Sequence, residues 1–143
     1  MEASATKHVA RAVVPQVRSE LRQQNYPVQL ISAVVFQAHG VGLGSVLEVF
    51  GQGELVPAEA QALADLAYCP ARGRTSIFAY NRLLFVPVYE ASQSVILLDL
   101  SGQTMASVSC GPQRALVMLF KTDDAALIQD FALSCEQFLN ERG

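Results

Sequence analysis

The chain has 143 residues, a length that suits one domain, residues 1–143, with a core that needs no covalent or metal staples. Hydrophobic residues make up 51% of the chain and charged residues only 16%. This composition has two explanations. Either an apolar surface of the chain contacts a partner or a second copy, or the domain is simply compact and rich in Ala. The net charge is -3 and the ten Lys and Arg residues are scattered, which argues against nucleic acid as the main partner.

No apolar run reaches the roughly 18 residues that a membrane span requires, and no hydrophobic signal core follows Lys7. We therefore expect a cytoplasmic protein without a membrane span. Cys69, Cys110 and Cys135 are odd in number and far apart, which fits reduced, mostly buried thiols better than a disulfide framework or a metal site. We predict no metal and no cofactor.

A helix is predicted within the first 25 residues, beginning near Ser4 or Thr6. Its apolar residues recur at three- and four-residue steps and form one apolar side: Val9, Ala12, Val13, Val17 and Leu21. Pro15 interrupts this pattern, so two shorter helices, one ending near Val13 and one beginning near Pro15, are an alternative.

Two strands follow, over residues 29–36 and 43–50, and the glycine-rich segment between them predicts a hairpin. Residues 57–67 then form a helix, with Pro57 in its first turn and Glu59 near its positive N-terminal end. Its shallow apolar side suits close packing on a sheet and consists of Ala60, Leu63, Ala64 and Ala67.

The segment 81–120 contains four short runs of apolar and β-branched residues: RLLFVPVY, SVILLDLSG, TMASVSC and RALVMLF. Polar connections of hairpin length separate them, which predicts an antiparallel meander. Asp99 is expected to hydrogen-bond within the turn to Gly102, and Gly111 to supply a residue that tolerates positive φ. Thr75–Tyr80 is either a further strand or the start of the first hairpin.

The runs do not alternate cleanly between apolar and polar residues, so both faces of the central strands should be covered by helices. Residues 125–140 provide the last of these helices, whose cleanest apolar line is Phe131, Cys135 and Phe138. The expected fold is therefore α/β of the α+β type. It has a central antiparallel sheet of about five or six strands, flanked by an N-terminal, a short middle and a C-terminal helix.

One glycine-rich segment could bind a ligand: His39, Gly40, Gly42 and Gly44 follow an apolar strand. Its spacing fits neither a dinucleotide fingerprint nor a P-loop. A G-x-G-x-G sequence after a strand is common in methyltransferases that use S-adenosylmethionine, but Ala38 replaces their usual acidic residue. A tight connection is the simpler interpretation.

Arg72, Arg74 and Arg82 could form a polar, partner-facing rim, although a solvated edge explains them equally simply. None of the Ser, His or Cys residues lies in a recognisable catalytic arrangement, so we expect no enzyme.

The order of elements resembles the plan shared by roadblock/LC7, longin and profilin domains, and more distantly by GAF and PAS sensors. LISAVVFQAHG, PAEAQALADLA and RALVMLF followed by DDAALIQDFALSCEQFL carry this resemblance. The roadblock/LC7 plan is our first choice. It implies a noncatalytic domain that pairs through a helix and an edge strand and serves as a platform for small GTPases or for motor and trafficking complexes.

Three functions follow, in order of preference. The first is a noncatalytic regulatory or adaptor module that binds a protein partner or forms a homodimer. The second is a small-molecule sensor of GAF or PAS type, with a pocket lined by Phe85, Val88, Ile96 and Met118. The third is an enzyme that binds a nucleotide or S-adenosylmethionine with the glycine-rich segment.

Overall fold

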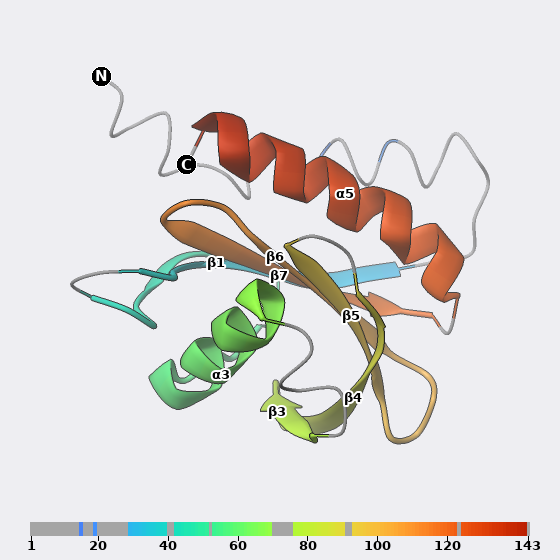
Figure 1. Cartoon of the computed structure of the whole chain (residues 1–143). Helices are drawn as coiled ribbons and strands as arrows, with labels where there is room; N and C mark the ends of the chain where they lie inside the picture. The colour runs from blue at the N-terminus through green and yellow to red at the C-terminus, as the bar shows by residue number, and fades with distance from the viewer. Residues whose placement is uncertain are drawn as a thin grey trace.

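The computed structural model describes Pro15, Ser19 and residues 29–39, 42–51, 53–69, 76–90, 93–122 and 124–142. Within these residues an antiparallel sheet of seven strands lies between two helices, one on each face (Figure 1). The predicted α+β fold class is confirmed. The sheet gains its seventh strand because part of the segment left open at Thr75–Tyr80 is a short strand. Pro15 and Ser19 are helical, and the rest of the predicted N-terminal helix lies outside the described residues.

The elements follow one another in a simple order. They are β1 (Gln29–Gln37), β2 (Val46–Gly51), α3 (Pro57–Tyr68), β3 (Phe78–Tyr80), β4 (Leu83–Glu90), β5 (Ser94–Asp99), β6 (Met105–Cys110), β7 (Arg114–Lys121) and α5 (Ala125–Arg142). In space the strands are ordered β2-β1-β7-β6-β5-β4-β3. The hairpin β1–β2 thus joins the meander β3–β7 through the β1–β7 pair, and β2 and β3 form the two edges. Neither described helix has the length and apolar character that a membrane crossing requires.

The core has two layers, one on each side of the sheet. On one side α3 buries Ala60, Leu63, Ala64 and Ala67, as the sequence predicted, together with Leu66. Its first turn is closed by Glu59, whose carboxylate accepts a hydrogen bond from the backbone N–H of Val56. On the other side α5 packs Ile128, Phe131, Cys135 and Leu139 on the sheet.

Gly111, in the turn between β6 and β7, is required by packing. A Cβ atom there would lie 2.8 Å from Cβ of Leu139 and 2.9 Å from its carbonyl oxygen, because α5 passes so close. The residue does not have positive φ, so the sequence-based reason for this glycine was wrong. Tyr68 of α3 donates a hydrogen bond of 2.6 Å to the carbonyl of the same Gly111. This turn therefore connects the two helices across the sheet.

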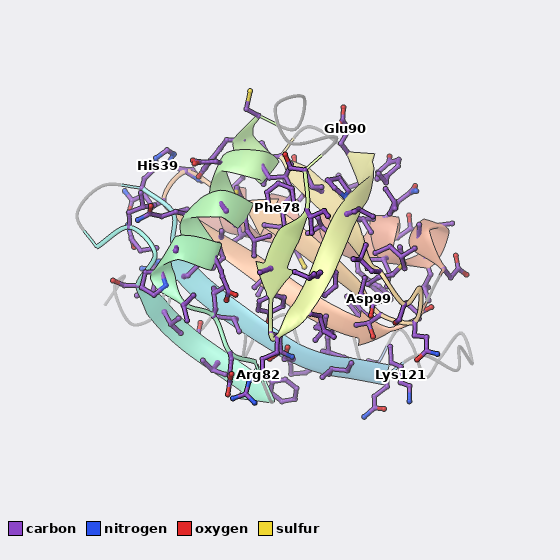
Figure 2. The ribbon with its side chains drawn as sticks, turned by 90° about the horizontal axis from the view of Figure 1, so that it is seen from below. His39, Phe78, Arg82, Glu90, Asp99 and Lys121 are labelled. Carbon is purple, nitrogen blue, oxygen red and sulfur yellow. The ribbon has the colours of Figure 1, made fainter. Side chains whose placement is uncertain are left out.

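The short edge strand β3 begins only at Phe78, which lies opposite Phe85 of β4. Asn81 and Arg82 form the two-residue turn between them, both with positive φ. The backbone N–H of Leu100 donates to the carbonyl of Leu84, so by the alternation of antiparallel pairs the backbone groups of Phe85 and Pro87 face β3. Pro87 has no N–H to donate, and β3 pairs only as far as Phe85. Figure 2 shows Arg82 and Glu90 at the two ends of β4.

Candidate protein-interaction site

The helix α5 covers β5 and β6 much more than β4, which leaves one part of the sheet open on its side (Figure 1). Cross-strand pairs fix which residues of β4 point there. Val86 lies opposite Leu98, and Tyr89 lies opposite Ile96. Ile96 belongs to the core beneath α5, and Leu98 packs against that core. Because side chains of paired residues share a face, β4 presents Leu84, Val86 and Tyr89 on the α5 side of the sheet.

Several large apolar side chains are solvent-exposed at this place. The exposed fractions are 50% for Leu84, 59% for Leu100, 41% for Tyr89 and 51% for Leu133, which is contributed by α5. We call these four residues the apolar face. Exposed apolar groups that gather over neighbouring elements are typical of a surface that contacts another protein.

A groove of about 170 Å³ separates β4 and β5 from α5. Tyr89 and Leu133 of the apolar face line it, and its polar lining includes Ser94, Gln129 and Asp130. The Ser94 hydroxyl donates to the Glu136 carboxylate at 2.8 Å, so this serine is part of the structural hydrogen bonding beneath α5. The groove thus offers an amide, a carboxylate and two apolar side chains to a partner, a combination that suits recognition of a side chain.

The glycine-rich segment forms a turn in the described residues, and Gly40 lies outside them. Gly42 and Gly44 have positive φ. The N–H of Gly44 donates to the carbonyl of Gln37, and the N–H of Ser45 donates to that of Gly42. These two N–H groups therefore serve the hairpin. The ligand-binding role of the segment stays a prediction.

His39 lies beside the end of α3, away from the apolar face. Its ring centroid is 4.7 Å from that of Tyr68. Both rings line a hollow of about 550 Å³, together with Asp65, Cys69 and Phe78. Burial raises the pKa of Tyr68 to about 12, and the neighbouring Cys110 thiol adds to the rise. The hydroxyl of Tyr68 is thus a permanent donor at neutral pH.

The predicted arginine rim is only partly described. Arg82 pairs with Glu54, with 3.0 Å between Nε and Oε2, and both side chains are mostly exposed. Asn81 also accepts a hydrogen bond from the backbone N–H of Glu54. Arg82 therefore ties the β3–β4 turn to the segment before α3. Arg72 and Arg74 lie outside the described residues, so a partner-facing role for the three arginines stays a prediction.

The four residues expected to line a sensor pocket do not meet. Phe85 belongs to the core on the α3 side, whereas Ile96 and Met118 belong to the core on the α5 side, and all three are fully buried. Val88 is 46% exposed.

Sequence reasoning missed the apolar face. Leu84 precedes the buried Phe85 and Leu133 follows the buried Ala132, and nothing in the local sequence separates these leucines from core residues. The missing signal was the path of α5, which follows from tertiary packing. Low overall charge was the one hint that some apolar surface stays uncovered.

No protein-family model and no curated protein matches this sequence. Solved structures do share its fold. Acanthamoeba castellanii profilin IA superposes with a TM-score of 0.63 at 15% identity, covering 78% of this chain and 86% of that one. LokiProfilin1, in a complex with rabbit actin, superposes with a TM-score of 0.61 at 10% identity, covering 92% and 91%. The fold is that of the profilins.

LokiProfilin2, also in a complex with rabbit actin, has the profilin fold too, with a TM-score of 0.58 at 10% identity and coverage of 89% and 96%. The roadblock/LC7 resemblance inferred from element order was therefore wrong. Both plans place strands and helices in a similar order along the chain, and element order does not determine which strands become neighbours. The spatial arrangement of the chain matches that of profilins.

Proposed function

We propose that this chain is a noncatalytic regulatory module that binds actin, or a protein built like actin, through the apolar face. The carrying observation is the uncovered group Leu84, Tyr89, Leu100 and Leu133, in a fold shared with two proteins solved in complex with actin. A cytoplasmic location, as expected from the sequence, accompanies this proposal.

The apolar face has the properties that tight protein contacts use. Tyr89 is an amphipathic anchor, and Leu133 stands across the groove from it on a separate element. Leu84 in β4 and Leu100 just after β5 extend the apolar area. Gln129 and Asp130 supply polar groups at the groove, as in the polar rim of ordinary interfaces.

A binding titration tests the proposal. Labelled actin, kept monomeric, is titrated with the chain, and saturable binding is expected at micromolar concentration. Leu84→Asp and Leu133→Asp place a charge in the contact and should each weaken binding about tenfold or more, a loss of about 1.4 kcal/mol.

Val56→Asp is the matched control. Val56 is 53% exposed and precedes the first turn of α3, where Asp is well tolerated. Binding should be unchanged in this variant. Absence of binding up to roughly 100 μM, or equal losses in all three variants, would contradict the proposal.

Homodimerisation, expected from the composition, is a separate proposal that does not require actin, and the edge strand β2 is its candidate surface.

A further inference from the structure

We propose that two copies of this chain associate about a two-fold axis by antiparallel pairing of β2 with β2 of the second copy. The strand β2 forms one edge of the sheet, and β3 forms the opposite edge. The seven-stranded sheets of the two copies would thereby become continuous.

The outward-facing backbone groups of β2 follow from its pairing with β1. The N–H of Gln37 donates to Ser45, and the N–H of Ala38 donates to Gln113 beyond β7. Odd-numbered residues of β1 therefore bond toward β2. Ala33 lies opposite Phe50 and Val35 opposite Glu48. The backbone N–H and C=O groups of Phe50 and Glu48 therefore face β1, and those of Val49 point away from the sheet.

Three apolar side chains stay exposed along this edge. Val46 and Val49 lie opposite Phe36 and Val34, both core residues on the α3 side, so both valines point to that side. The pairing of β1 with β2 contains a β-bulge: Val35 lies opposite Glu48 and Phe36 opposite Val46, so Leu47 is an extra residue in β2. The exposed fractions are 41% for Val46, 41% for Leu47 and 53% for Val49. We call Val46, Leu47 and Val49 the β2 strip. An exposed apolar edge of this kind is a template for another strand.

The charge pattern of β2 fits a second copy. With Val49 opposite its own equivalent, Leu47 lies across from Gly51 of the second copy, where no side chain obstructs it. Glu48 is the only charged residue of β2 and points to the α5 side. It would lie across from Phe50 of the second copy instead of meeting its own equivalent, so this register brings no like charges directly opposite one another.

The expected dimer is weak and reversible. A six-residue strand is about 20 Å long, and such an edge contact is smaller than the roughly 800 Å² per partner of a standard stable interface. The β2 strip and the apolar face lie at different parts of the sheet, so a dimer would carry two apolar faces.

Cross-linking tests the register directly. Val49→Cys is made in a Cys69→Ser background, because Cys69 is exposed while Cys110 and Cys135 are buried. In the proposed register the Cα atoms of the two Val49 residues lie about 5.5 Å apart, within reach of a disulfide. Val88→Cys in the same background is the control, since Val88 is 46% exposed at the opposite part of the sheet.

Under mild oxidation, Val49→Cys should form a covalent dimer about tenfold faster than Val88→Cys, because pairing raises the effective concentration of its thiol. Sedimentation of the unmodified chain should show a mass that rises toward the dimer with concentration, and Val49→Lys should remain monomeric while keeping its circular dichroism spectrum. Equal cross-linking rates, a monomer up to roughly 500 μM, or an unchanged dimer in Val49→Lys would overturn the proposal.

Discussion

The backbone N–H of Leu100 donates to the carbonyl oxygen of Leu84 over 3.0 Å, and this bond holds two exposed leucines together beside the β4–β5 pair. Both side chains lie on the α5 side of the sheet, beyond the area that the helix covers. A folded chain gains nothing from leaving them in water, since each buried Å² of apolar surface is worth about 25 cal/mol. Binding of a partner recovers that free energy, which is why we place the function here.

Replacement of Leu100 should leave the fold almost intact. We expect Leu100→Ala to change the free energy of unfolding by less than about 0.5 kcal/mol, because the side chain is 59% exposed. Leu97→Ala, three residues earlier in β5 and fully buried, should cost about 2–5 kcal/mol. Urea denaturation of both variants measures the difference. A large loss in Leu100→Ala would show that this leucine is structural and remove it from the apolar face.

Asp99 should make the stability of the fold sensitive to acid. Burial pushes the pKa of Asp99 upward, but hydrogen bonds from the Ser101 hydroxyl and from the backbone N–H groups of Thr104, Gln103 and Gly102 outweigh burial and hold the pKa below its ordinary value. The folded-state pKa is therefore lower than the unfolded value of about 3.9. The carboxylate stabilises the fold above the unfolded pKa, and this stability is lost as the pH falls through the folded-state pKa.

Asp99→Asn removes that titration and one strong acceptor of the Ser101 hydroxyl, which lies 2.7 Å away. We expect a loss of about 1 kcal/mol at neutral pH and a flatter dependence of the unfolding free energy on pH below about 5. Urea denaturation over a pH series measures both. Asp65→Asn, on the exposed side of α3, is the control. An unaltered pH profile in Asp99→Asn would contradict the assigned role.

Gly111→Ala should destabilise the chain by about 1–3 kcal/mol, because the added methyl group would overlap both the side chain and the carbonyl of Leu139. Leu139→Ala should not rescue it, since the carbonyl overlap persists. Gly102 provides the comparison. It has a φ of +78° with open space around its Cβ position, so Gly102→Ala carries only a backbone penalty of about 1 kcal/mol. Thermal unfolding of the single variants and of the Gly111→Ala/Leu139→Ala double variant measures these losses of stability. Full rescue by Leu139→Ala would contradict this packing.

Of the three cysteines, Cys69 should react first with a thiol reagent. It is exposed, whereas Cys110 and Cys135 are buried. Burial raises the pKa of the Cys110 thiol to about 12; the Tyr68 hydrogen bond opposes this rise, and the charges of Glu136 and Asp65 add to it. A disulfide-exchange reagent at pH 8 should label only Cys69 in the folded chain and all three thiols in urea, and Cys69→Ser should abolish the fast reaction. Fast labelling of Cys110 would mean that the region beneath Tyr68 opens readily.

Local patterns were enough to predict most of the elements. The β-branched runs and their polar connections predicted the strands from β4 to β7, and the step of Ala60, Leu63, Ala64 and Ala67 predicted the buried side of α3. Asp99 binds the turn that follows it, as expected from its place before Ser101 and Gly102. These features are determined by residues close in sequence, so local chemistry suffices.

Features that depend on distant residues escaped prediction. The reason for Gly111 lies in Leu139, 28 positions away, and the exposure of Leu84 depends on where α5 crosses the sheet. The likeness to profilins rests on superposition of the folded chain, which apolar periodicity along the sequence does not provide. The candidate surface was missed for the same reason, since an exposed leucine in a strand looks like a buried one until its covering helix is placed.

Methyl NMR of the chain with actin shows whether the apolar face is the surface that actin contacts. The chain is labelled at its Leu methyl groups and mixed with unlabelled monomeric actin. We expect the signals of Leu84, Leu100 and Leu133 to shift or broaden, while those of Leu47, at the β2 edge, and Leu63, on the buried side of α3, stay in place. Unchanged spectra throughout, or changes centred on Leu47 or Leu63, would contradict it.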